Sequence, residues 1–184
     1  MGFGENEHMI LQELDTVLGQ INQDDVQKAL NLIEASEKIF FHGLGRAGYA
    51  GKSFVMRLMH MGREVYAIGD TNTPNFSEND LMIICSGSGE TIQFVAMANK
   101  AKNYGGKLIV FTSTPGSTLE KMADAAILIP APCKDQEKSS FTSVQPMASL
   151  FEQAILLTGD AMVLTMMEGR SDEKDMFSRH SNLE

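Results

Sequence analysis

Five short apolar runs without polar alternation constrain the fold of this chain more than any other feature. They are Lys38–His42, Glu64–Ile68, Leu81–Cys85, Leu108–Thr112 and Ala126–Ile129. Runs of this kind are typical of strands buried on both faces, as in a parallel sheet. Because segments with helical periodicity separate them, we expect a doubly wound α/β fold with five parallel strands, in which ligands bind at the carboxyl ends of the strands.

Apolar residues at helical spacing predict helices before, between and after these strands. Two helices precede the first strand, one over Met9–Ile21 and one from about Gln23 to Ser36. The other predicted helices are Tyr49–Met61, Ile92–Tyr104, a short one at Thr118–Ala123, and Pro146–Met167, which Pro146 opens near its first turn.

The 184 residues fit one domain on the usual length of ~100–200 residues. Within it we expect N-terminal helices over residues 1–36, an α/β core over 37–130, and a loop, long helix and tail over 131–184. The segment Ala131–Ser143 is polar and without periodicity, which predicts a long loop. The composition of Glu168–Glu184 predicts a frayed tail.

Charge and cysteine content limit the partners of the chain. Fifteen Lys and Arg against 24 Asp and Glu give a net charge of −9, which repels nucleic acid and anionic membranes, although a local pocket of N–H groups can still bind a phosphate. Cys85 and Cys133 cannot make a disulfide scaffold. Met1–His8 does not resemble a signal peptide, and apolar stretches such as Leu81–Cys85 are far short of the ~20 residues that span a bilayer. We expect a cytoplasmic protein.

The loop after the third predicted strand is suited to a phosphate group. Ser86–Thr91 (SGSGET) combines three hydroxyls and two glycines ahead of a predicted helix. Glycines let the backbone approach an anion, free N–H groups at the helix start point toward it, and hydroxyls donate further hydrogen bonds. Thr112–Thr114 follows the next strand and is expected to close the same crevice. The alternative is that Ser86–Thr91 only caps a helix.

A second glycine-rich segment, Gly43–Gly48 (GLGRAG), follows the first strand and matches the dinucleotide-binding fingerprint, with Asp70 about twenty residues further on. The order of strand, loop, helix, strand and acid is correct for that function. Against nicotinamide binding, Asp70 lies beyond the apolar run, and the chain has no room for a substrate domain. Both interpretations of Gly43–Gly48 stay open at this point.

Glu152 and His60 are the candidates for proton transfer, which needs a group that titrates near the operating pH. Glu152 lies within an apolar helical segment, where partial burial favours the neutral acid, but a surface position is equally compatible with the pattern. His60 has apolar neighbours, as a core histidine would. His42 and His8 are expected to be structural and solvated, respectively. No His, Cys, Asp or Glu residues show metal-ligand spacing, so we predict no metal site.

Taken together, Gly43–Gly48, Ser86–Thr91 and Glu152 resemble the sugar isomerase (SIS) domain family, which has a flavodoxin-like fold. Arg57–Gly62, Gln145–Gln153 (QPMASLFEQ) and Arg179–Glu184 are similar to those members that interconvert D-arabino-3-hexulose 6-phosphate and fructose 6-phosphate in the ribulose monophosphate pathway of formaldehyde fixation. This similarity covers almost the whole chain. It implies an isomerase that needs neither a redox cofactor nor a metal.

The resemblance also implies roles for individual residues. Glu152 would be the base that moves a proton between C2 and C3 through a cis-enediol, and His60 would move protons between the substrate oxygens. The implied substrate-binding residues are Ser86, Ser88 and Thr91 on the phosphate, Gly87, Gly89 and Glu90 shaping that loop, the main chain of Gly45, Arg46 and Ala47 along the sugar, and His180 in the tail.

This sequence departs from the family at Ala47, where relatives commonly carry Ser, so a side-chain contact there is in doubt while the backbone N–H remains. Family members are typically homotetramers with sites near subunit contacts, which would order the tail and His180. Two alternatives stay open beside nucleotide binding. One is another phosphosugar aldose–ketose isomerase, and the other is a non-catalytic phosphosugar-binding protein that tolerates loss of Glu152.

Overall fold

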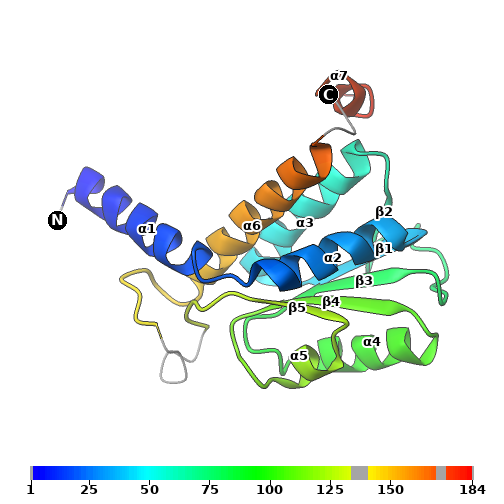
Figure 1. Cartoon of the computed structure of the whole chain (residues 1–184), viewed down its shortest axis with the longest axis horizontal. Helices are drawn as coiled ribbons and strands as arrows, with labels where there is room; N and C mark the ends of the chain where they lie inside the picture. The colour runs from blue at the N-terminus through cyan, green and yellow to red at the C-terminus, as the bar shows by residue number, and fades with distance from the viewer. Residues whose placement is uncertain (1, 134–140, 169–172, 184) are drawn as a thin grey trace.

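A computed structural model describes residues 2–133, 141–168 and 173–183 (Figure 1). Its five strands are β1 (Lys38–Gly43), β2 (Glu64–Ala67), β3 (Leu81–Cys85), β4 (Lys107–Thr112) and β5 (Ala125–Leu128). Its helices are α1 (Phe3–Leu18), α2 (Gln23–Ala35), α3 (Gly45–His60), α4 (Ile92–Asn103), α5 (Thr118–Met122), α6 (Ser149–Met167) and α7 (Glu173–Phe177). All five predicted strands are therefore present.

The strands form one parallel sheet in the order β2-β1-β3-β4-β5. Helices α2, α3 and α6 cover one face and α4 and α5 cover the other, while α1 projects sideways from the body (Figure 1). The chain leaves β1 toward β2 through α3 and leaves β3 toward β4 through α4. The strand order thus reverses between β1 and β3, which is where doubly wound folds bind ligands. The predicted α/β class is confirmed.

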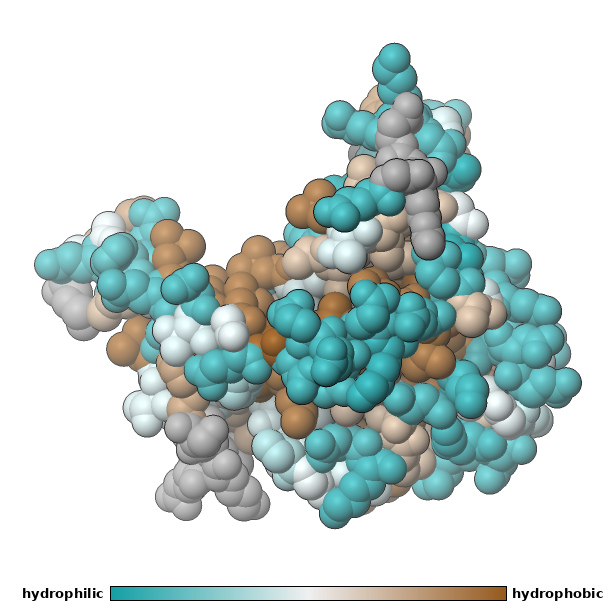
Figure 2. Space-filling model, in the orientation of Figure 1, coloured by the Kyte–Doolittle hydropathy of each residue, from teal (hydrophilic) through white to brown (hydrophobic). Residues whose placement is uncertain are grey.

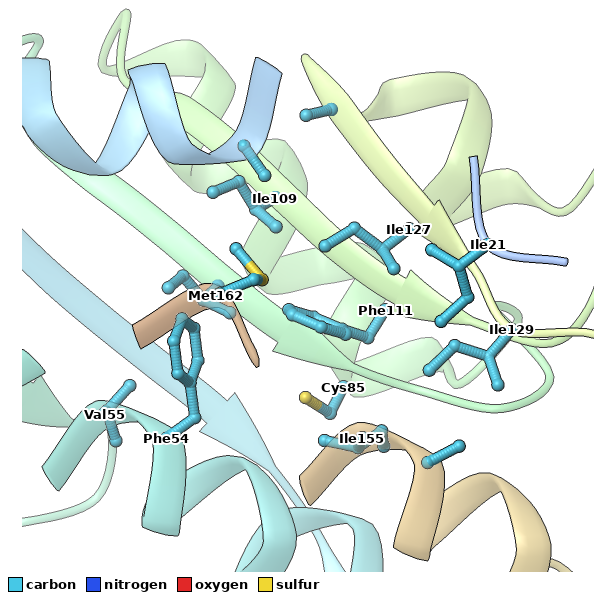
Figure 3. Packing of buried hydrophobic residues seen from close by; sticks show 14 of the residues in the cluster. Ile21, Phe54, Val55, Cys85, Ile109, Phe111, Ile127, Ile129, Ile155 and Met162 are labelled. Carbon is cyan, nitrogen blue, oxygen red and sulfur yellow. The ribbon is translucent and has the colours of Figure 1, made fainter. Parts of the chain in front are cut away.

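The sheet is buried on both faces because consecutive strand residues point to opposite sides. On β1, Ile39 and Phe41 belong to the core under α3 and α6, whereas Phe40 belongs to the core under α4. Figure 3 shows the first of these cores, where side chains from α3 and α6 meet Cys85 and Phe111 of the sheet. Burial on both faces explains why these strands lack polar alternation.

Three predicted helix starts are wrong, and two of the differences matter for the site. Helix α3 begins at Gly45 rather than Tyr49, so most of the glycine-rich segment is the first turn of a helix and not a loop. Helix α6 begins at Ser149 rather than Pro146, because Met147 has a left-handed backbone (φ 56°) that a helix cannot include. Helix α1 also starts earlier than predicted, at Phe3, where the Gly2 N–H donates to Glu5.

The tail is more ordered than its composition predicts. It forms α7, and Arg179 donates to the His60 carbonyl at 3.2 Å and to the Asp175 carboxylate at 2.9 Å. Part of the tail and part of the predicted loop, residues 169–172 and 134–140, lie outside the described residues.

In the described part of the chain, α6 is the one helix long and apolar enough to cross a membrane, with a mean hydropathy of 1.3 over its most apolar window. Half of that window is buried inside the fold, as expected of a core helix. Its first turn carries Glu152, and Asp160 lies exposed further along.

Glycines set how closely α3 approaches its neighbours. A Cβ on Gly48 would lie 2.5 Å from the Gly43 carbonyl oxygen, so α3 can pack on the end of β1 only with glycine there. A Cβ on Gly159 of α6 would lie 2.8 Å from the Cβ of Phe54 on α3. Because neither a backbone oxygen nor a Cβ atom can rotate away, these contacts fix how closely α3 lies to β1 and to α6.

We expect Gly159→Ala to lower the free energy of unfolding by roughly 1–3 kcal/mol, the usual cost of overpacking a core. Gly4→Ala is the matched control, because Gly4 is also helical but has no atom within 4 Å of its would-be Cβ. That variant should be neutral or slightly stabilising. Urea unfolding followed by circular dichroism measures both values, and equal stability of the two variants would contradict this account of the α3–α6 contact.

Candidate functional site

A cavity of about 490 Å³ lies at the carboxyl ends of β1 and β3, where the strand order reverses. Three segments distant in sequence enclose it: the start of α3, the loop between β3 and α4, and the start of α6. Its lining residues are Leu44, Gly45, Arg46, Ala47, Cys85, Ser86, Gly87, Ser88, Thr91, Phe94, Cys133, Met147, Ala148, Phe151 and Glu152. The fold thus brings together both glycine-rich segments and Glu152.

Three helices begin at this cavity, and none of them has a side-chain cap. The cap positions are Leu44 for α3, Thr91 for α4 and Ala148 for α6. Each helix start leaves backbone N–H groups without a partner in the helix, and each carries the equivalent of about half a positive charge. Convergence of three such ends makes the cavity attractive to an anion.

The loop between β3 and α4 is held by hydrogen bonds behind the cavity. The carbonyl of Gly87 accepts the Ser113 N–H at 3.0 Å and lies within 3.0 Å of the hydroxyls of Thr112, Ser113 and Thr114. Thr112–Thr114 therefore supports this loop from the end of β4 and does not itself line the cavity. Gly89 is required because its φ is +62° and a Cβ there would overlap the Ser117 hydroxyl.

Glu90 turns away from the cavity and ties the loop to α5. Its two carboxylate oxygens accept the backbone N–H of Thr118 at 2.7 Å and the Thr118 hydroxyl at 2.8 Å. These two hydrogen bonds lower the pKa of Glu90, the backbone bond most. Glu90 and Gly89 do not line the cavity, and the contacts described here shape the loop.

Glu152 and Arg46 are the two charged side chains that line the cavity in the described part of the chain. They form an ion pair in which Arg46 Nε lies 2.5 Å from Glu152 Oε2. The Glu152 side chain is 15% exposed and that of Arg46 is 67% exposed. Cys85 also lines the cavity, but burial raises the pKa of its thiol, so it stays protonated and is a poor nucleophile.

The structure does not bring His60 and His180 to the cavity of their own chain. Helix α3 has 16 residues, and at 1.5 Å per residue it separates His60 from the cavity end by about 20 Å. There His60 is buried and stacks on the exposed His180 with ring centroids 5.3 Å apart. Burial lowers the pKa of His60, and the positive charges of Arg57 and His180 lower it further.

Three other polar residues from the sequence analysis also lie away from the cavity. Asp70 is exposed on a turn after β2, which leaves the dinucleotide fingerprint without its acidic partner. His42 is half-buried against Phe94, with ring centroids 4.8 Å apart, and burial lowers its pKa. His8 is exposed beside Gln12. Among the described residues, no three His, Cys, Asp or Glu side chains cluster as a metal site would need.

Sequence reasoning missed the residues that shape the α6 side of the cavity. Phe151, Cys133 and Met147 line it, although nothing in their types or spacing indicates a site. It also missed Glu13 of α1, whose carboxylate accepts the Ser143 hydroxyl and the Val144 N–H, both at 2.7 Å, and the Gln145 side-chain amide. These bonds fix the segment that leads into Met147 and α6.

The Glu90–Thr118 contact predicts a pH-dependent difference in stability between the protein and its Glu90→Gln variant. Because the folded-state pKa of Glu90 is lowered, its stabilisation is fully present above the unfolded-state pKa of about 4.3 and is lost as the pH falls through the folded-state value. Urea unfolding from pH 7 to pH 3 should show the variant less stable at pH 7 and the difference shrinking below about pH 4.3. A constant difference across this range would contradict the contact.

Comparison with known proteins agrees with this geometry. Residues 31–157 match the SIS domain family. The 3-hexulose-6-phosphate isomerase of Bacillus subtilis is 43% identical over 95% of both chains, and that of Methanocaldococcus jannaschii is 36% identical over 94% of this chain and 98% of its own. A crystal structure from Methanococcus jannaschii, for which a molecular function of 3-hexulose-6-phosphate isomerase was inferred, has a TM-score of 0.83 at 30% identity and covers 98% of this chain and 99% of its own. The chain belongs to the SIS domain family, and it matches the 3-hexulose-6-phosphate isomerases among its members over nearly its full length.

Proposed function

We propose that the chain is an isomerase that interconverts D-arabino-3-hexulose 6-phosphate and fructose 6-phosphate. The observation that carries this proposal is the position of Glu152, the one carboxylate among the described residues that lines the cavity at which three uncapped helices begin. Relatives named 3-hexulose-6-phosphate isomerase, which match over nearly the whole chain, support the choice of substrate. The reaction would belong to the ribulose monophosphate pathway in the cytoplasm.

The substrate phosphate would bind at the start of α4. Ser86, Ser88 and Thr91 line the cavity there, with Gly87 between them. The N–H groups of Gly45, Arg46 and Ala47 precede the first intrahelical bond of α3, which Gly48 donates to Leu44, so they are free to bind sugar oxygens. A backbone donor at Ala47 does not need the hydroxyl that relatives commonly have at this position.

The chemistry needs one base on one side of the bound sugar. The Glu152 carboxylate would take the C2 proton, the C–H electron pair would form a C2–C3 double bond, and the carbonyl electrons would move to O3. A proton would then pass from O2 to O3, and Glu152 would return its proton to C3 to give fructose 6-phosphate. General acid/base catalysis of this kind contributes about 10²–10⁴-fold. No residue in this scheme requires a metal or a redox cofactor.

We expect Glu152→Gln to lower kcat by about 10²–10⁴-fold because the amide cannot accept the C2 proton. The assay is fructose 6-phosphate formation from enzymatically made D-arabino-3-hexulose 6-phosphate, read by a coupled dehydrogenase. Asp160→Asn is the matched control, because it removes an exposed carboxylate from the same helix. Binding of fructose 6-phosphate without turnover by the native chain would favour a phosphosugar-binding protein or another isomerase instead. Tight NAD binding without fructose 6-phosphate binding would favour the nucleotide interpretation.

We also propose that the protein works as a homotetramer in which His60 and His180 of one subunit reach the cavity of another. Exposed apolar side chains support such an assembly: Phe3 and Leu11 on α1, Tyr49 and Met56 on α3, and Leu156, Leu157 and Leu164 on α6. Figure 2 shows apolar surface gathered in the recess between α1 and the body of the molecule. The lowered pKa of His60 leaves its ring neutral and able to exchange protons between O2 and O3.

Mixing two inactive variants tests this assembly. The Glu152→Gln and His60→Gln substitutions remove different residues of a shared site. After random reassociation of an equal mixture, about a quarter of the sites should combine an intact Glu152 with an intact His60 and recover activity. A mixture of Glu152→Gln with Glu152→Ala is the control and should recover none. Formation of mixed tetramers, checked by native mass spectrometry, without recovered activity would contradict a site shared between subunits.

A further inference from the structure

The ion pair between Arg46 and Glu152 also separates two neighbouring hollows in the surface. One is the cavity described above, and the other is a hollow of about 320 Å³ lined by Arg46, Tyr49, Ala50, Ser53, Glu152, Gln153 and Leu156. Arg46 and Glu152 are the two residues that line both. The Arg46–Glu152 pair therefore lies at the edge of the cavity, between the two hollows.

The contact occupies only a part of each charged group. Arg46 Nε binds Glu152 Oε2, and in the part of the chain that the structure describes neither Nη group of Arg46 nor Oε1 of Glu152 has a hydrogen-bond partner. A guanidinium has five N–H donors in a fixed fork, so four remain available for a ligand. The carboxylate keeps one oxygen free to accept a proton while the other is held.

The location of Arg46 is costly unless an anion accompanies it. Arg46 is the second residue of α3, where the positive end of the helix disfavours a cation. The first turn of α6 is likewise positive, and Glu152 lies within that turn. In the resting protein the carboxylate balances the guanidinium, and the helix ends remain positive.

Proton transfer removes this balance. Before the transfer the site holds a carboxylate and a guanidinium, and afterwards it holds a neutral carboxylic acid, an enediolate and the same guanidinium. Each of the two remaining charges, on the enediolate oxygen and on the guanidinium, would cost free energy if it were left unpaired in a partly buried site. A guanidinium that already lies beside the base can accept the new charge without moving far, as preorganised charge stabilisation requires.

We infer that the Arg46 side chain holds the Glu152 carboxylate in the resting enzyme and becomes the counter-charge of the enediolate once Glu152 carries the C2 proton. This role rests on the proposed function, because it needs Glu152 to act as the base. It assigns the guanidinium itself to the reaction, beyond the backbone contact of Arg46 with the sugar. The hydrogen bond from Nε to Oε2 makes Arg46 a positioning residue, and its Nη groups would contact the reacting oxygens.

Truncation of Arg46 followed by chemical rescue tests this role. We expect Arg46→Ala to lower kcat by about 10²–10³-fold, the usual loss when one charge-stabilising donor is removed, with a smaller change in KM. Because the Arg46 side chain is 67% exposed, guanidinium ion should enter the space left behind and restore part of the rate at millimolar concentration. Urea has the same shape without the charge and should not restore it. Guanidinium should not rescue Glu152→Gln.

Lys52→Gln is the matched control, since it removes an exposed cation from the same helix and should keep the native rate. The inference would be overturned if Arg46→Ala kept the native kcat, or if urea rescued this variant as strongly as guanidinium does. The proposed function would still stand in that case, provided that the native chain turns over the substrate and Glu152→Gln does not. Absence of turnover by the native chain would overturn the proposed function and this role with it.

Discussion

The close contact between α3 and α6 is the constraint on which the site depends. Both helices begin at the cavity, and Phe54 against Gly159 fixes their separation along their length. Arg46 lies in the first turn of α3 and Glu152 in the first turn of α6, so the distance between the two charges follows from the packing of the two helices. Core packing far from the cavity thus determines the distance between the Arg46 and Glu152 side chains.

Local electrostatics in the cavity oppose the charge of the whole molecule. The chain carries a net charge of −9, yet three helix starts present positive potential in one small volume, where the charges of Arg46 and Glu152 offset each other. Such a field is short-ranged, because salt screens exposed charges within about 10 Å. A negatively charged protein can therefore bind an anionic metabolite while its remaining surface repels large polyanions.

The sequence predicted the sheet because buried parallel strands leave continuous apolar runs. It also put forward Ser86–Thr91, from its glycines and hydroxyls ahead of a helix, and Glu152, from the family resemblance, and the fold brings both to one cavity. The start of α6 could not be predicted, since the left-handed backbone of Met147 reflects tertiary packing and Met does not favour that conformation. Glu13 was missed for a similar reason, because it acts on residues 130 positions away in the chain. To predict that His60 lies far from Glu152, one must know the length and direction of α3 in the fold, and periodicity alone does not give them.

The uncapped helix starts have a consequence for how proteins of this kind diverge. The groups that we propose for anion binding are main-chain N–H groups, which every residue except proline supplies. On that proposal, mutations would exchange side chains that line the cavity, such as that of Ala47, and leave the anion-binding N–H groups intact. Side-chain substitutions alone would then change which sugar such a site accepts, because the backbone groups that bind the anion stay the same.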